Sequence, residues 1–373
     1  MKVALVHDHL AQDGGAEKVL KVLSEIFPEA PIYTLLYEKD NADKYYKDKK
    51  IETSVIQKMP GGVKHYQWYM PFMPMAVEFF DMSNFDLVIS DTSSFAKGVI
   101  TSPDSLHICY CHTPTRYLWS DTHSYIQELK YNKYFKKIIS LILNYIRMWD
   151  KLAADRVDAF LANSETVKTR IKKYYRRNST VIYPPVEIDK FSPDPKKKED
   201  KNPYFLVGSR LTPYKRIDIV IEAFKELGWN LKIFGDGVDK KRLQKISRGY
   251  DNIEFLGRVS DRELADLYRD SRAYIHPQTE DFGITAIEAM ACGTPVVAFR
   301  SGGATETVSE NKTGVFFDQQ KPEAIIKAVQ KLSARQFDPG EIRREAEYFS
   351  VDNFKKEIID YLAQYFPDIK KKI

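Results

Sequence analysis

Cysteine is scarce in this chain, with three in 373 residues, and this scarcity excludes a disulfide framework. The composition therefore favours a reducing compartment, and we expect a cytoplasmic protein. Cys109 and Cys111, with His107 and His112 nearby, offer metal-ligand atoms. Their spacing differs from a Cys-x-x-Cys zinc loop and a second pair is missing. Buried structural thiols are the favoured interpretation, and we expect no metal.

Long apolar runs are also lacking. The apolar core that follows Met1 is about five residues long, whereas a signal peptide needs roughly seven to fifteen. The longest apolar stretch, residues 138–146, contains Ser140 and Asn144, and a membrane-spanning helix needs about 20 apolar residues. We expect neither a leader nor a transmembrane segment. The net charge of +5 is small for a DNA-binding domain and no nucleic-acid motif is present, so we expect no nucleic-acid partner.

The apolar content of 43% is sufficient for two cores, and the length fits two domains of about 150–200 residues each. Short apolar runs typical of buried strands alternate with amphipathic helical segments along the chain. This alternation predicts an α/β fold in which two doubly wound parallel-sheet domains face a central cleft. Residues 184–202, rich in Pro and Lys, predict a linker between a first domain, 1–183, and a second domain, 203–349.

Two glycine-containing turns follow predicted strands. Gly14 and Gly15 precede an amphipathic helix, where backbone N–H groups can approach an anion, although a tight turn without a ligand is the commoner explanation of such a pair. The Gly-x-Gly-x-x-Gly fingerprint is absent, which disfavours a dehydrogenase. In the second domain Gly208 ends a strand, and Arg210 and Lys215 follow it. Two such cations suit two linked phosphates, and the alternative is a pair of solvated surface charges.

Residues 276–297 carry the most specific pattern. Glu280 falls in a loop after a predicted strand, and Glu288 falls inside the helix that begins near Gly283. Unpaired backbone N–H groups at the start of that helix form an anion site, and they belong to Phe282, Gly283, Ile284 and Thr285. Two carboxylates that bind hydroxyl groups, with an anion site between them, match a nucleoside diphosphate sugar. The alternative is two surface glutamates beside a well-terminated helix.

These motifs resemble those of the retaining family-4 glycosyltransferases, which have the GT-B architecture of two Rossmann-like domains. The resemblance covers nearly the whole chain. It includes G-x-R-L-x-x-x-K at 208–215, F-G-D-G at 234–237, F-L-G-x-V at 255–259 and E-x7-E at 280–288. It also implies that the final helix, within residues 350–373, packs back on the first domain.

The resemblance assigns roles to residues of both domains. Arg210 and Lys215 bind the donor diphosphate, Glu288 binds the ribose and Glu280 binds the donor sugar. The base lies near Gly235, Arg258 and Val259. The segment 111–123, C-H-T-P-T-R-Y-L-W-S-D-T-H, is similar to that of bacterial mannosyltransferases of surface-polysaccharide synthesis, in which the histidine matching His112 lines the reaction centre. A local turn before Pro114 is the alternative role for His112.

The residues that follow His112 also have two interpretations. We expect them to shape the acceptor or sugar pocket, with core packing an equal alternative for the aromatic ones: Arg116, Tyr117, Trp119 and Asp121. The resemblance implies transfer of a hexose with retention, with mannose from GDP-mannose as the leading donor and a saccharide or lipid-linked saccharide as acceptor. The Asp-x-Asp motif of metal-dependent transferases is absent, so we expect neither a metal nor a cofactor. Rhamnosyl, glucosyl and galactosyl donors, a GT-B phosphorylase or epimerase, and a non-enzymatic nucleotide-sugar-binding module remain alternatives.

Three stretches of the first domain favour peripheral contact with an anionic membrane on the inner face of the plasma membrane. Residues 128–151 carry six cations against two acids, and residues 168–177 carry six cations and no acid. Residues 65–80 are rich in aromatic residues and Met. The alternative is that the charges lie on solvated helix faces and the aromatic residues pack in a core.

Overall fold

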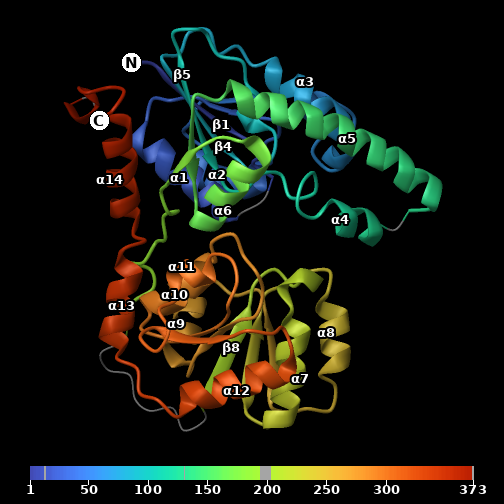
Figure 1. The fold of residues 1–373 in the computed structure, drawn as a ribbon, viewed down its shortest axis with the longest axis vertical. Helices are drawn as coiled ribbons and strands as arrows, with labels where there is room; N and C mark the ends of the chain where they lie inside the picture. Colours follow the sequence, from blue (N-terminus) through green and yellow to red (C-terminus); the bar gives the residue numbers. More distant parts are fainter. Residues whose placement is uncertain (12–13, 130, 194–202, 372–373) are drawn as a thin grey trace. The chain divides into compact units, whose positions relative to one another are not determined.

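Two compact units make up the protein, and each contains a parallel β-sheet flanked by helices (Figure 1). This computed structural model describes residues 1–11, 14–129, 131–193 and 203–371. Unit 1 comprises Met1–Pro185 and Phe354–Ile373, and unit 2 comprises Val186–Asn353. The predicted α/β class with two parallel-sheet domains is confirmed.

The described part of unit 1 forms a seven-stranded parallel sheet in the order β3-β2-β1-β4-β5-β6-β7. The strands are β1 (Val3–His7), β2 (Ile32–Thr34), β3 (Ile51–Thr53), β4 (Leu87–Thr92), β5 (Leu106–Cys111), β6 (Ala159–Ala162) and β7 (Ser179–Val181). The helices are α1 (Gly15–Ile26), α2 (Lys39–Tyr46), α3 (Met73–Glu78), α4 (Thr122–Glu128), α5 (Lys133–Arg156), α6 (Glu165–Arg170) and α14 (Val351–Leu362), of which α14 joins this unit from Phe354 onward.

The described part of unit 2 forms a six-stranded parallel sheet in the order β10-β9-β8-β11-β12-β13. The strands are β8 (Tyr204–Gly208), β9 (Asn230–Phe234), β10 (Ile253–Gly257), β11 (Tyr274–His276), β12 (Val296–Phe299) and β13 (Gly314–Phe317). The helices are α7 (Ile217–Leu227), α8 (Lys240–Ile246), α9 (Asp261–Asp270), α10 (Ile284–Ala291), α11 (Ala304–Thr307), α12 (Pro322–Ser333) and α13 (Pro339–Glu347). In both sheets the central strands are fully buried, because helices cover both faces.

Within the described part of the predicted linker, Pro184 and Pro185 belong to unit 1 and the residues from Val186 onward belong to unit 2. The backbone N–H of Val186 donates to the carbonyl oxygen of Phe349 at 2.9 Å. The Arg343 guanidinium donates to the carbonyl oxygen of Ile188 at 3.0 Å. Arg343 thus supplies a hydrogen-bond donor to a backbone carbonyl oxygen in a Pro-rich segment that forms no helix or strand. Residues 194–202 of the predicted linker lie outside the described residues.

Helix α14 returns the chain to unit 1 (Figure 1). The Phe354 ring packs edge-on against Tyr110 of β5, with ring centroids 5.7 Å apart. Lys355 pairs with Glu25 of α1 at 2.8 Å. The last segment of the chain therefore completes the core that the first segment begins.

Candidate functional site

Lys215 and Glu280 form an ion pair at the carboxyl edge of the unit 2 sheet. Lys215 ends a short 3-10 helix, Pro213–Lys215, that follows β8, and Glu280 lies in the loop after β11. Since β8 and β11 are neighbours in a parallel sheet, the loops at their carboxyl ends meet. Lys215 is 9% exposed, so it is not one of the solvated surface cations that the sequence left open.

The environment of Glu280 keeps its carboxylate charged. Gln278 Nε2 donates to Glu280 Oε1 at 3.0 Å. Burial alone would raise the pKa of Glu280, but Lys215 and the other nearby donors outweigh it and hold the pKa below its usual value. The Gly303 N–H donates to the Glu280 carbonyl at 2.9 Å, and a Cβ on Gly302 would lie 2.2 Å from that oxygen. The loop that carries Glu280 is therefore packed too closely against Gly302 for another residue type to fit.

His276 lies beneath this loop, at the end of β11. It is 0% exposed, and burial lowers its pKa to about 4, so the imidazole is neutral. Gln278 Nε2 lies 3.3 Å from His276 Nδ1. The other ring nitrogen, His276 Nε2, has no hydrogen-bond partner among the described residues. A Cβ on Gly283 would lie 3.3 Å from that Nε2 atom. His276 and Gln278 were not predicted from the sequence. Both are polar residues at the carboxyl end of a strand, and that position could have indicated them as site residues.

The start of α10 has the geometry that the sequence predicted for an anion site. Gly283 precedes the helix with φ +96, a conformation that favours glycine. Within the described chain, the backbone N–H groups of Gly283, Ile284 and Thr285 donate no hydrogen bond. The Tyr274 hydroxyl lies 3.1 Å from Thr285 Oγ1. Phe282 is buried against Phe349, with ring centroids 5.5 Å apart, so its side chain is a packing residue.

The structure places Glu288 one turn inside α10, where it is buried, while Glu280 lies in the loop. This is the arrangement expected for the two carboxylates. Arg210 lies exposed after β8, in the same loop as Lys215. The loops at this edge of the sheet therefore carry two cations and the Glu280 carboxylate beside the three free N–H groups of the α10 start, and Glu288 follows within the helix.

The remaining predicted residues of unit 2 lie at the carboxyl ends of three neighbouring strands, β8, β9 and β10. A Cβ on Gly208 would lie 2.4 Å from the carbonyl oxygen of Phe234, and one on Gly235 would lie 1.8 Å from that of Ser209. These glycines allow the loops after β8 and β9 to touch. Arg258, which is exposed, and the half-buried Val259 follow β10.

His112 lies at the carboxyl edge of the unit 1 sheet and contacts a buried carboxylate. His112 Nε2 is 2.6 Å from Asp91 Oδ1, and His7 Nδ1 is 2.9 Å from Asp91 Oδ2. Burial alone would lower the pKa of His7, but Asp91 and Glu17 outweigh it and raise that pKa to about 10. Although burial alone would raise the pKa of Asp91, the two imidazoles hold it below its usual value. The sequence indicated His112 only, although His7 and Asp91 are polar residues at or near the end of apolar strands.

Gly14 and Gly15 begin α1, as predicted. Gly14 precedes the helix with φ −147, which is extended backbone, so no left-handed turn requires glycine there. A Cβ on Gly14 would instead lie 2.9 Å from Glu17 Oε2. Glu17 is buried in the first turn of α1, with Oε1 3.9 Å from His7 Nε2. A carboxylate already occupies the space beside this helix start.

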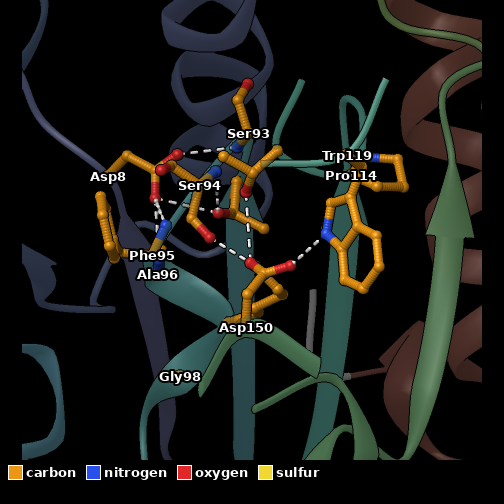
Figure 2. Close-up of polar contacts among 12 residues, drawn as sticks. Asp8, Ser93, Ser94, Phe95, Ala96, Gly98, Pro114, Trp119 and Asp150 are labelled. Atoms are coloured by element: carbon orange, nitrogen blue, oxygen red, sulfur yellow. Dashed lines mark hydrogen bonds and ion pairs between the residues drawn. The ribbon is translucent and has the colours of Figure 1, made fainter. Parts of the chain in front are cut away.

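Asp8, directly after β1, shapes the turn that follows β4 (Figure 2). Its carboxylate accepts hydrogen bonds of 2.7–2.9 Å from Thr92 Oγ1 and from three backbone N–H groups, those of Ser93, Phe95 and Ala96. This turn leads into the short 3-10 helix Ala96–Gly98. The sequence did not indicate Asp8 as a structural residue, because its partners lie more than 80 positions away.

Asp150 of α5 connects that turn to the segment after His112 (Figure 2). It accepts from Lys97 Nζ at 2.5 Å, from Thr115 Oγ1 at 3.2 Å and from Trp119 Nε1 at 2.7 Å. Both Lys97 and Asp150 are 1% exposed. The predicted pocket residue Trp119 therefore has a packing role, which was the alternative interpretation.

The other three expected pocket residues contact protein groups. Arg116 Nε donates to Asp121 Oδ2 at 2.7 Å, and the Tyr117 hydroxyl lies 2.9 Å from Ser94 Oγ. Arg116 and Asp121 are each about one third exposed, at 35% and 36%, so their polar atoms remain accessible.

The three cysteines are free and buried. His107 Nε2 lies 2.8 Å from Ser90 Oγ, and Cys109 and Cys111 pack in a core cluster with Phe160. Across the described ranges, no three His, Cys, Asp or Glu side chains are grouped as metal ligands. Nor does any described helix combine the length and apolar character that crossing a bilayer requires.

Comparison with known proteins places both units in one group of enzymes. Residues 13–190 match the family described as Glycosyltransferase Family 4, and residues 188–349 match Glycosyl transferases group 1. A GDP-mannose-dependent alpha-(1-6)-phosphatidylinositol monomannoside mannosyltransferase of Mycolicibacterium smegmatis is 28% identical over 229 residues, covering 52% of this chain and 60% of the relative. An alpha-1,3/1,6-mannosyltransferase of Mus musculus is 26% identical over 335 residues, covering 79% of this chain and 77% of the relative.

In several of these alignments the chain spans between about half and two thirds of the length of the curated relatives it matches. Among solved structures, Anabaena Alr3699/HepE in complex with UDP and glucose has a TM-score of 0.72 at 18% identity, covering 98% of this chain and 100% of that one. At that identity the likeness concerns the fold. With two adjoining family matches across residues 13–349 and a fold shared over its length, the chain belongs to the family-4 glycosyltransferases of GT-B architecture.

Proposed function

We propose that this chain transfers a hexosyl group from a nucleotide sugar to a saccharide or lipid-linked saccharide, with retention at the anomeric carbon. The observation that carries the proposal is the Lys215–Glu280 pair beside the free N–H groups of Gly283, Ile284 and Thr285. A buried cation and three unpaired donors suit a diphosphate, and a charged carboxylate suits the hydroxyls of a sugar. Family membership supports the same reaction.

Most of the predicted site residues take a role in this proposal. Lys215 and Arg210 bind the diphosphate with the start of α10, Glu280 binds the donor sugar and Glu288 binds the ribose. Gly208 and Gly235 let the backbone approach the nucleotide, and Arg258 and Val259 lie beside the base. His112 contacts the donor sugar. No residue need act as a nucleophile, and the reaction needs neither metal nor cofactor.

The proposed step breaks the bond between the anomeric carbon and the leaving phosphate oxygen, and the acceptor oxygen forms its bond on the same face. The acceptor proton passes to the leaving diphosphate. Lys215 and the α10 N–H groups stabilise the negative charge that develops on that diphosphate, which is the contribution preorganised donors make to catalysis.

We propose mannose from GDP-mannose as the donor, supported by the two mannosyltransferase relatives. The test is a panel of nucleotide sugars, GDP-mannose, UDP-glucose, UDP-galactose and a rhamnosyl donor, each incubated with and without acceptor saccharides. Release of nucleoside diphosphate that depends on both GDP-mannose and an acceptor is expected. NMR of the product should give the donor's anomeric configuration, and the opposite anomer would refute retention. Binding without turnover across the panel would instead favour a nucleotide-sugar-binding module.

We also propose peripheral contact between unit 1 and an anionic membrane on the inner face of the plasma membrane, mediated by helix α5 (Figure 1). One face of α5 packs inward through Leu143, Ile146, Asp150 and Ala153. The opposite face carries apolar side chains more than half exposed, namely Ile138, Leu141, Tyr145, Met148 and Leu152. Successive positions differ by about 100°, so residues two apart, such as 141 and 143, lie on nearly opposite faces.

Lysines at one end of this exposed face supply charge complementary to anionic lipid, with Lys133 and Lys137 exposed. Trp68, Phe72 and Phe79 add exposed aromatic rings in the segment that includes α3. Trp149 of α5 donates to Glu78 of α3 at 2.8 Å, so the two elements adjoin.

The membrane test is co-sedimentation with phosphatidylglycerol vesicles at low salt, with phosphatidylcholine vesicles as the neutral comparison. Leu141→Glu should weaken binding about tenfold or more, because burying one Leu contributes about 2 kcal/mol. Ile100→Glu is the matched control, since Ile100 is also half exposed in unit 1 but lies outside α5. No binding by the wild-type protein, or equal loss in both variants, would refute the α5 contact.

A further inference from the structure

A buried chain of ionisable side chains links His112 to the first turn of α1. Asp91 lies between two imidazoles, with Oδ1 2.6 Å from His112 Nε2 and Oδ2 2.9 Å from His7 Nδ1. The other nitrogen of His7 faces Glu17 at 3.9 Å, an ion-pair distance rather than a hydrogen bond. Asp91 is 0% exposed. No solvent competes for its two oxygens.

The sheet register brings this chain together. His7 of β1 pairs with Asp91 of β4, and Asp91 pairs with Tyr110 of β5. The His112 N–H donates to the carbonyl oxygen of Thr92 at 2.9 Å, which extends the β4–β5 ladder by one residue. His7, Asp91 and His112 therefore lie together at the carboxyl edge of the unit 1 sheet, at the ends of three adjacent strands.

The contacts fix where the protons are. An ionised carboxylate only accepts hydrogen bonds, so a nitrogen 2.6 Å from Asp91 Oδ1 must carry a hydrogen. Nε2 of His112 is thus protonated whether the ring is neutral or charged. Its Nδ1 has no hydrogen-bond partner in the part of the chain that the structure describes. The Tyr110 hydroxyl donates to the Ile182 carbonyl, which holds the Tyr110 ring in place. That ring packs against the His112 imidazole with centroids 5.3 Å apart and so limits rotation of the imidazole.

We propose that Asp91 is a positioning residue that fixes the Nε2 proton of His112 and leaves Nδ1 as the atom that meets the ligand. This inference rests on the proposed function, because it assigns the contact between His112 and the donor sugar to one atom. A neutral His112 accepts a hydrogen bond from a sugar hydroxyl at Nδ1, and a protonated His112 donates one there. His7 acts through Asp91, because its Nδ1–H keeps the second carboxylate oxygen turned away from His112.

The direct test is the tautomer of His112 in the wild-type protein. Two-bond 1H–15N correlation spectra of 15N-histidine-labelled protein distinguish the ring nitrogens, and His112→Gln identifies the signal among the seven histidines. We expect a proton on Nε2 and no neutral form protonated at Nδ1. A neutral ring protonated at Nδ1 alone would overturn the proposal, whether or not any variant folds.

The second test replaces the carboxylate. Asp91→Asn gives one of its two imidazole neighbours an amide N–H in place of an acceptor, as in enzymes where loss of an orienting carboxylate lowers kcat by about 10⁴-fold. We expect kcat to fall at least about 100-fold, nucleoside diphosphate affinity to remain within about twofold, and the His112 spectrum to change. Ser90→Ala is the control, because it removes a buried hydrogen bond to His107 from the adjacent position of β4. An Asp91→Asn protein with wild-type kcat and an unchanged His112 signal would overturn the proposal.

The His112 spectrum and the transfer assay test the positioning role of Asp91 and the transferase activity separately. If no nucleotide sugar reacts, the transferase assignment fails, while the wild-type spectrum still decides which nitrogen of His112 carries the proton. If transfer occurs and His112 is protonated at Nδ1 alone, the positioning role of Asp91 fails and the transferase assignment stands.

Discussion

Replacing Lys97 with Met tests the buried ion pair that connects three segments of unit 1. Lys97 Nζ and Asp150 Oδ1 are 2.5 Å apart and both residues are 1% exposed. Burial alone would lower the pKa of Lys97, but Asp150 outweighs it and raises that pKa, so the Lys97 ammonium is charged. Lys97→Met retains most of the side-chain volume and leaves the Asp150 carboxylate with neutral donors only. We expect a loss of about 3–5 kcal/mol in the free energy of unfolding, as for other buried pairs deprived of one partner.

The control is an exposed pair of the same chemistry in the same unit. Lys168 and Glu165 are 2.9 Å apart with side chains 44% and 55% exposed, so Lys168→Met should cost less than about 1 kcal/mol. The double variant Lys97→Met/Asp150→Asn should recover part of the loss, because the amide that replaces the Asp150 carboxylate carries no charge and its oxygen can still accept from Trp119.

Urea unfolding followed by Trp fluorescence measures these values. A Trp229→Phe background restricts the signal to unit 1, because the other three tryptophans, 68, 119 and 149, lie there. A Lys97→Met protein within about 1 kcal/mol of the parent would refute the reasoning, as would a double variant less stable than the single one.

Three further predictions concern catalysis, pH and local structure. Lys215→Ala should lower kcat about 10²–10³-fold in the transfer assay. Lys225→Ala, which removes a cation of helix α7 paired with Glu222, should leave kcat unchanged, and equal kcat for both variants would contradict the site. Because the pKa of His7 is raised from 6.5 to about 10, its stabilisation is complete below pH 6.5 and is lost as pH rises toward 10. The free energy of unfolding should therefore fall over that interval, and a His7→Gln protein with the same slope would refute the assignment. Asp8→Asn should destabilise unit 1 by about 2–3 kcal/mol in the same urea assay, because an amide places an N–H group where Asp8 accepts four hydrogen bonds; an unchanged midpoint would show that the turn tolerates the amide.

The strands with long apolar runs were predicted from the sequence, and the short edge strands were not. Ile51–Thr53 and Ser179–Val181 have three residues each and lie at the two edges of the unit 1 sheet. Gly314–Phe317 lies at an edge of the unit 2 sheet. No residue of the two unit 1 edge strands is fully buried, so their sequences carry a weaker apolar signal than those of the buried central strands.

Local motifs were predictable where a single segment carries the chemistry, as with Glu280, Gly283 and Glu288. Two residues that act through contacts with distant positions, Asp91 and Gly302, were missed. Asp91 contacts His7 across 84 positions of sequence, and Gly302 is required only because the Glu280 carbonyl lies against it. The pair Gly302–Gly303 follows a buried strand, as Gly14–Gly15 follows β1, so the same pattern would have indicated this second loop.

The return of α14 to unit 1 has a consequence for the order in which the protein assembles. Unit 2 is one continuous stretch, whereas unit 1 is interrupted and receives Phe354 only after all of unit 2 has been synthesised. On the ribosome, unit 2 can therefore reach its native state first. Tyr110 and Glu25 contact Phe354 and Lys355 only after this last segment has been synthesised. A nascent chain stopped at residue 353 should contain a protease-resistant second half and a first half whose aromatic core is still open.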